Sequence, residues 1–308
     1  MEGVLQQLTR PKAPLPSSGV VLSGLTGILL LLLAWGVLSD RFAKEEKAAL
    51  FPSPIATWNR FCDYLGYGPD TRDRIQAAKS HHESRSLPWT SRHELAIREQ
   101  ARDSLHQLGT DLRTSIMRVT LAFFLAAVLA IPLGIAMGTY AWVDGLLQPV
   151  AEFVRYIPVP ALIPLLIILF GVDEAPKVLL IFLGTFSQLL LMVGNEVKQV
   201  PESLLRACYC LGGTHGEAVS SVIMKQSMPG IFDALRMCNG WAWTWLIVAE
   251  LVAADAGMGF RIIRFQRYLQ TDQIFLYLVA LGLLGLAVDR LFHLLNRQLF
   301  PWRGSVDY

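Results

Sequence analysis

The sequence is poor in charged residues. Asp, Glu, Lys and Arg make up 17% of its 308 residues, whereas hydrophobic residues make up 53%. Soluble domains usually carry about 25% charged residues. The shortfall is concentrated in apolar runs of ~18–22 residues, the length that crosses about 30 Å of hydrocarbon. This composition excludes an ordinary soluble domain and predicts a polytopic membrane protein.

Cysteines, metal ligands and clustered charge are also scarce. The four cysteines form neither a disulfide framework nor a zinc pattern, and we interpret them as small apolar side chains: Cys62, Cys208, Cys210 and Cys238. One polar cluster matches no metal-ligand spacing, so we expect a solvated helical face and no metal site there: His81, His82, Glu83, His93 and Glu94. The net charge is +2 with Lys and Arg spread among acids, which leaves no nucleic-acid footprint.

Catalytic motifs are missing as well. The sequence has no G-x-x-x-x-G-K-[ST] loop to hold ATP phosphates, no H-E-x-x-H zinc motif and no G-x-S-x-G nucleophile elbow. We therefore predict a non-enzymatic chain with no catalytic residue and no cofactor of its own.

What the sequence does contain is six apolar runs. They cover 19–39, 116–138, 149–172, 175–197, 231–254 and 274–295. Uninterrupted apolar runs favour helices over barrel strands, because each helix satisfies its own backbone hydrogen bonds in lipid. The sequence thus predicts an all-α membrane protein with six transmembrane helices. Pro158, Pro160 and Pro164 should bend or break the third.

Basic residues that flank the runs predict the orientation. With six spans, one set of Lys and Arg falls on a single side, which the positive-inside rule assigns to the cytoplasm: Arg10, Lys12, Lys198, Arg206, Lys225, Arg297 and Arg303. The tails 1–18 and 299–308 are then cytoplasmic. Residues 40–115 form a periplasmic loop, whose polar insertion at 66–106 is expected to hold one or two amphipathic helices around Pro88.

The segment 201–230, between the fourth and fifth runs, is too long for a simple turn. Its apolar residues recur at helical spacing, which predicts two short helices joined around Gly212 and Gly213. Pro229 is expected to close the element before the fifth span begins. A cytoplasmic loop of this length should have a partner.

The same segment resembles the EAA loop of permeases from binding-protein-dependent ABC importers. Five residues match the pattern of that loop: Ala207, Leu211, Gly212, Met228 and Pro229. Arg206 stands in place of the family's Glu, and Cys208 in place of its second Ala. The stretches 155–172, 240–260 and 301–304 resemble permeases of the nitrate/sulfonate/taurine group.

The resemblance implies a type I ABC importer permease fold, with a core permease domain at 116–298. It also implies a bacterial inner-membrane location and three kinds of protein partner. These are a second permease copy in a homodimer, two cytoplasmic ATPase subunits that bind ATP and Mg, and a periplasmic or lipid-anchored substrate-binding protein. The residues it assigns to ATPase coupling are Arg206, Ala207, Leu211, Gly212, Gly213, His215 and Pro229.

The substrate implied is a small anion or organosulfonate of the nitrate, taurine, alkanesulfonate or bicarbonate class. A stand-alone secondary transporter or channel subunit is the alternative function, although such a protein has no need for an ATPase dock.

Glu250 is the one carboxylate well inside a predicted span, where an ionisable side chain is costly. It either lines the pathway or gate, together with Trp243 and Asn239 on the same helical face, or it is a structural group near the outer interface, hydrogen-bonded to a neighbouring helix. Weaker pathway candidates are Tyr156, Ser187 and Gln188.

Overall fold

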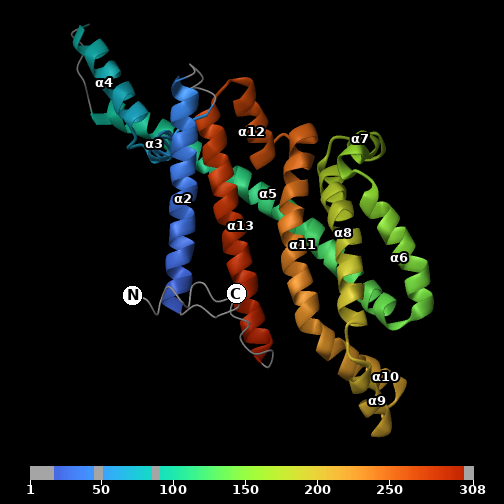
Figure 1. The fold of residues 1–308 in the computed structure, drawn as a ribbon. Helices are drawn as coiled ribbons and strands as arrows, with labels where there is room; N and C mark the ends of the chain where they lie inside the picture. The colour runs from blue at the N-terminus through green and yellow to red at the C-terminus, as the bar shows by residue number, and fades with distance from the viewer. Residues whose placement is uncertain (1–16, 45–50, 85–90, 302–308) are drawn as a thin grey trace. The chain divides into compact units, whose positions relative to one another are not determined.

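The computed structural model describes residues 17–44, 51–84 and 91–301 (Figure 1). Every regular element in these ranges is helical, which confirms the predicted all-α class. The chain divides into two compact units. Of the described residues, the first comprises 17–44, 51–84, 91–105 and 265–276, and the second comprises 106–264 and 277–301.

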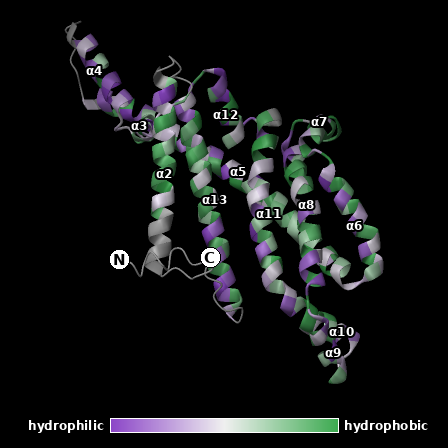
Figure 2. Cartoon of the chain, viewed as in Figure 1, coloured by the Kyte–Doolittle hydropathy of each residue, from purple (hydrophilic) through white to green (hydrophobic). Residues whose placement is uncertain are grey.

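The first unit contains α2 (Ser17–Lys44), α3 (Pro54–Tyr64), α4 (Pro69–Ser84) and the start of both α5 (Ser91–Thr139) and α13 (Thr271–Leu299). Aromatic and polar contacts hold it together. Trp35 of α2 stacks on Phe275 of α13, with ring centroids 5.3 Å apart, and Arg60 of α3 bonds Asp272. Figure 2 shows that α4 is largely hydrophilic, in contrast to the long apolar helices.

The second unit holds most of the predicted permease core. Its elements are the rest of α5, then α6 (Ala141–Tyr156), η1 (Val159–Leu162), α7 (Ile163–Phe170), α8 (Glu174–Lys198), α9 (Glu202–Cys210), α10 (His215–Glu217), the π-helical η2 (Ala218–Ile223), α11 (Met224–Ala253), and the remaining parts of α12 (Met258–Arg267) and α13. The helix α8 packs beside α11 along its length (Figure 1). Leu189, Val193 and Ile231 lie at the centre of the resulting core and are almost fully buried.

Small residues let α5 and α8 approach closely. A Cβ atom added to Gly134 of α5 would lie 2.7 Å from Cβ of Val193, well inside van der Waals contact. Close backbone approach at small residues is a common way for helices to associate where lipid removes the hydrophobic driving force. This packing fixes α8, which carries charged residues at both ends.

Four described helices are long and apolar enough to cross a membrane: α2, α5, α8 and α13. They correspond to the first, second, fourth and sixth predicted runs. A fifth is obtained if α6 and the η1–α7 segment, bent by 85° relative to each other, count as one span. The fifth predicted run lies in α11, which is long enough but carries Asp233, Arg236 and Glu250 among its apolar residues. The number of six spans therefore stays a prediction.

One of the two predictions about prolines is confirmed, and the other is wrong. The third run, predicted as 149–172, is broken: α6 ends at Tyr156, and a new helix starts beyond Pro158. Proline fixes its own φ and disfavours the helical region for the residue before it, so the break follows from Pro158 and Pro160. The expectation for Pro229 is wrong, because Pro229 lies inside the continuous helix α11 and does not end an element.

The region predicted as the loop 40–115 is mostly helical. The second predicted span, 116–138, is the C-terminal part of α5, which already begins at Ser91. The helices α4 and α5 lie on either side of Pro88, as expected for the insertion, although Pro88 itself falls outside the described residues.

The glycine contact between α5 and α8 gives a first prediction. Gly134→Ala should lower the free energy of unfolding by ~1–3 kcal/mol, because the added methyl overpacks the helix interface. Gly109→Ala is the matched control in the same helix, since no atom lies within 4 Å of its added Cβ. It should be neutral or stabilising by up to ~1 kcal/mol, because alanine is the better helix former. Thermal unfolding of the detergent-solubilised chain measures both, and equal stabilities would contradict the packing.

Candidate functional site

The loop between α8 and α11 consists of the short helices α9 and α10 and the π-helical η2. Leu205 of α9 and Val219 of η2 pack against the core cluster of α5, α8 and α11, which anchors the loop. No residue of α9 is buried, and its surface includes Leu204, 41% exposed, and Tyr209, 46% exposed. Leu211 follows directly and is 89% exposed.

Gly212 ends α9 in a left-handed conformation, with φ +83°. Its N–H donates to the Tyr209 carbonyl at 3.0 Å, and the N–H of Gly213 donates to the Cys208 carbonyl at 2.9 Å. These two bonds are the Schellman arrangement, in which glycine is the usual residue at positive φ. The predicted joint between two short helices at Gly212 and Gly213 is thus confirmed.

A capping box starts the second half of the loop. The Thr214 N–H and hydroxyl both donate to a Glu217 carboxylate oxygen, at 2.7 and 2.8 Å, and the Glu217 N–H donates back to the Thr214 hydroxyl at 3.4 Å. The sequence pattern T-x-x-E could have revealed this box. The bond from the Thr214 N–H, and then that from its hydroxyl, lowers the pKa of Glu217. Because the folded-state pKa is lowered, the cap stabilises the loop at neutral pH and weakens as the pH falls through that pKa.

The other residues assigned to ATPase coupling lie around the Gly212 turn and the Thr214–Glu217 capping box, apart from Pro229. Arg206, Ala207 and His215 are exposed, and Arg206 pairs with Glu202 at 2.7 Å on the surface of α9. His215 Nδ1 lies 3.0 Å from the Tyr209 hydroxyl and so links the two short helices. Pro229 is buried inside α11 and lies apart from this exposed group.

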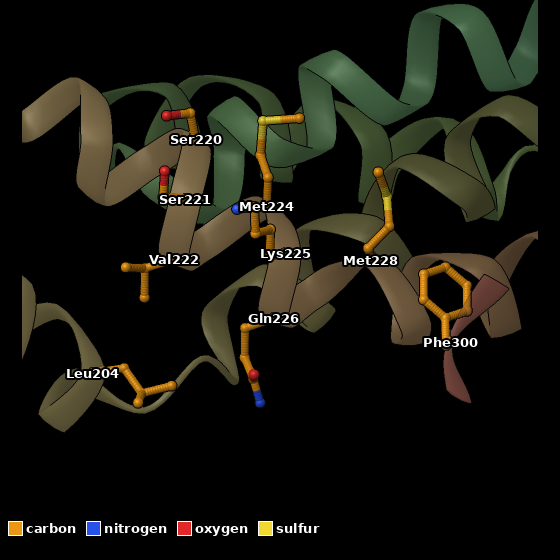
Figure 3. Close-up of a pocket in the computed structure, with 9 residues that line it drawn as sticks. All are labelled: Leu204, Ser220, Ser221, Val222, Met224, Lys225, Gln226, Met228 and Phe300. Carbon is orange, nitrogen blue, oxygen red and sulfur yellow. The ribbon is translucent and has the colours of Figure 1, made fainter. Parts of the chain in front are cut away.

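A cavity of about 740 Å³ adjoins the loop. Figure 3 shows Leu204 and Val222 on one side of it and Phe300 on the other. The lining is mostly apolar, and Lys225 is its one charged side chain; the full set is Leu204, Ser220, Ser221, Val222, Met224, Lys225, Gln226, Met228 and Phe300. The loop therefore exposes the apolar side chains of Leu204, Tyr209 and Leu211 and borders a mostly apolar cavity.

Glu250, the predicted intramembrane carboxylate, belongs to a buried ion cluster. Its side chain is 0% exposed, and its Oε1 accepts from Arg118 Nη1 of α5 at 2.7 Å and from the Ser115 hydroxyl at 2.8 Å. Its Oε2 accepts from the Gly259 N–H at 2.8 Å. Arg118 also donates to both carboxylate oxygens of Glu174 in α8, at 2.5 and 2.6 Å. The contacts support the structural alternative for Glu250, a group bonded to neighbouring helices.

A second buried carboxylate extends the cluster. Asp111 of α5 accepts from Arg261 Nε at 2.8 Å, from the Tyr277 hydroxyl at 3.2 Å and from the Gly257 N–H at 3.2 Å. Gly257 has φ +119°, and a Cβ atom there would collide with Glu250 and Arg118. Glycine is therefore required where the chain after α11 passes over the ion pair.

The remaining pathway candidates do not join this cluster. The Trp243 indole N–H donates to Asn239 Oδ1 at 3.2 Å, one turn apart on α11. Ser187 is buried in α8, and Gln188 beside it is half-buried. Tyr156 is exposed at the end of α6, where the Arg155 guanidinium lies 5.2 Å from its ring centroid. Sequence reasoning missed Asp111, Arg118 and Lys177, although charge at the start of an apolar run was a usable signal for the last two.

The described residues contain no group of three or more His, Cys, Asp or Glu side chains that could hold a metal ion. His82 and His93 do lie close, with ring centroids 4.7 Å apart.

Comparison with known proteins identifies this arrangement. Residues 130–301 match the family described as the binding-protein-dependent transport system inner membrane component. The chain belongs to this family of permeases. As such it is a non-catalytic membrane subunit, ATP hydrolysis is carried out by partner ATPases, and the stand-alone transporter alternative is not favoured.

Individual relatives agree with that assignment. The permease is 35% identical over 200 residues to the taurine transport system permease protein of Escherichia coli, which covers 65% of this chain and 73% of that protein. It is 27% identical over 184 residues to the bicarbonate transport system permease protein of Synechococcus elongatus, covering 59% and 66% of the two chains. The fold matches an inward-facing MetNI methionine ABC transporter with a TM-score of 0.53 at 17% identity, over 62% of this chain and 97% of that one.

The ion cluster of the permease gives a second prediction. Glu250→Gln should lower the free energy of unfolding by ~3–5 kcal/mol, because it leaves the buried cations Arg118 and Lys177 with Glu174 as their one remaining carboxylate partner. Glu202→Gln removes the carboxylate of the Arg206 pair, whose side chains are 78% and 77% exposed, and should cost less than ~1 kcal/mol. Thermal unfolding of the purified permease compares the two. Similar losses of stability in the two variants would show that the buried pair stabilises the fold no more than the exposed pair does.

Proposed function

We propose that this permease forms, as a homodimer, the translocation pathway of an ATP-driven importer for a small anion or organosulfonate. The observation that carries the proposal is the helical loop at 201–223, which exposes the apolar side chains of Leu204, Tyr209 and Leu211. Exposed apolar clusters of this kind mark protein interaction sites. The partner that fits is a cytoplasmic ATPase subunit, two per transporter, which binds ATP and Mg.

The loop is built to transmit motion. A flexible segment would absorb the displacement of an ATPase. In this loop the Schellman bonds fix the end of α9, the Thr214–Glu217 capping box fixes the start of α10, and the contact between the Tyr209 hydroxyl and His215 Nδ1 joins the two. From η2 the chain continues without interruption into α11. Movement of α9, which carries Arg206 and Ala207, is therefore passed directly to α11.

The substrate class rests on the relatives. The Escherichia coli relative is named for taurine and the Synechococcus relative for bicarbonate, and both are small molecules that carry an oxyanion. We propose a substrate of this chemistry, delivered by a periplasmic or lipid-anchored binding protein. Asn239 and Trp243 on α11 remain the proposed pathway residues, with Tyr156, Ser187 and Gln188 as weaker candidates.

The second permease copy requires an unpartnered face. On α11, Met237 is 60% exposed and Trp241 is 54% exposed, one turn apart. Tryptophan in an apolar face is a frequent anchor of protein interfaces. We propose that this side of α11 faces the second copy or the pathway between the copies.

The Gly212 turn gives a third prediction, on coupling. Gly212→Ala places a side chain at positive φ, which costs ~1–2 kcal/mol, and should fray the end of α9 while the helical core still assembles. In the transporter reconstituted with its ATPase and binding protein, taurine uptake should fall, and loaded binding protein should no longer stimulate ATP hydrolysis.

Gly216→Ala is the matched control. Both added methyl groups meet open space, but only Gly212 has a positive φ. Gly213 is unsuitable as a control, because its added Cβ would lie 2.9 Å from the Cys208 carbonyl oxygen. Uptake at the wild-type rate by Gly212→Ala would refute the coupling role of the turn.

Orientation in a bacterial inner membrane gives a fourth prediction. We propose that both termini and the loop at 201–223 are cytoplasmic and that α4 is periplasmic, where it provides a platform for the binding protein. In a chain with its four cysteines replaced, Ser80→Cys should react with an impermeant maleimide in intact cells, whereas Glu202→Cys should react only after permeabilisation. The opposite labelling pattern would reverse the topology.

A further inference from the structure

Two buried cations meet one exposed carboxylate at the start of α8. The side chains of Arg118 and Lys177 are 5% and 2% exposed, whereas that of Glu174 is 61% exposed. Arg118 Nε and Nη2 donate hydrogen bonds to the two carboxylate oxygens of Glu174, and Lys177 Nζ lies 3.0 Å from Glu174 Oε1. The anion is thus the only member of this group that faces outward.

The two carboxylates bonded to Arg118 are held in different ways. Glu250 is enclosed, and the Ser115 hydroxyl and the Gly259 N–H fill its other acceptor positions. Within the part of the chain that the structure describes, the carboxylate of Glu174 accepts hydrogen bonds from the Arg118 and Lys177 side chains alone. Removing the Glu174 carboxylate would leave two buried cations against one buried carboxylate, a net charge of +1 at a position open to the surface.

From this geometry we propose that Arg118 and Lys177 form a cradle for a small oxyanion, and that Glu174 is its built-in occupant. When the first turn of α8 moves during transport, an incoming oxyanion replaces the Glu174 carboxylate. The identification of that oxyanion with the transported substrate rests on the proposed function, whereas the cradle itself does not.

The donor set selects the ligand chemistry. The Nε and Nη2 atoms of a guanidinium present two parallel N–H groups that match two oxygens of one anion, and an ammonium adds a third donor. Carboxylates, sulfonates and bicarbonate all offer such a pair of oxygens. Chloride has no second acceptor atom, and a neutral amide brings no charge to balance the buried cations.

The test is rescue of a vacated cradle by an added anion. Glu174→Ala removes the resident carboxylate and leaves room, and its melting temperature should rise saturably with formate or ethanesulfonate. Chloride at the same ionic strength and formamide at the same concentration should give much smaller shifts. The wild-type chain and Glu174→Gln, whose side chain still fills the cradle, should show no such dependence.

Two further variants separate the cradle from general salt effects. Glu202→Ala vacates the carboxylate of an exposed ion pair and should show no oxyanion rescue. Adding Lys177→Gln to Glu174→Ala should remove most of the rescue. Recovery of folded Glu174→Ala only from cells or buffers that contain formate supports the cradle as well.

Equal shifts with chloride and formate, or failure of Glu174→Ala to fold with or without oxyanion, would overturn the cradle. Rescue by formate and ethanesulfonate combined with no taurine or bicarbonate uptake by the complete transporter would leave the cradle standing and reject the proposed substrates. Uptake without rescue would reject the cradle alone.

Discussion

The guanidinium of Arg118 has almost no contact with water, and this constraint organises the second unit of the permease. A buried charge is tolerated only when it is paired and its donors are satisfied. Arg118 meets this requirement by bonding Glu174 of α8, Glu250 of α11 and the Ala256 carbonyl beyond α11. One side chain of α5 thereby fixes the ends of two helices and the path of the chain that follows them.

The loop at 201–223 contrasts with this buried cluster, because it lies at the surface. It carries apolar side chains on an exposed surface, and its two short helices are ended and begun by the left-handed Gly212 and the Thr214–Glu217 capping box. The helix α11 joins this loop to the ion cluster, because it begins directly after the loop and carries Glu250 near its other end. In the proposed function, a displacement of α9 would pass through the turn at Gly212 into η2 and along α11 to the ion cluster.

Much of this could be predicted from sequence, because it depends on local patterns. The apolar runs correctly indicated α2, α5, α8 and α13, and the glycine pair correctly indicated the turn at Gly212. Pro229 misled because proline also occurs inside membrane helices, where neighbouring groups satisfy the freed carbonyl. The partners of Glu250 could not be predicted from the sequence, because Arg118 is 132 residues away in the chain and only tertiary packing brings the two together.

We propose that α9, η2 and α11 move as one rigid body when the ATPases bind ATP. Spin labels at Cys210 and at Gln226, an exposed residue in the first turn of α11, report on this directly in the assembled transporter. We predict a narrow distribution of distances between the two labels that is the same in the nucleotide-free and ATP-bound states. A distance that shifts or broadens on ATP binding would show that the loop bends independently of α11, and would contradict the account.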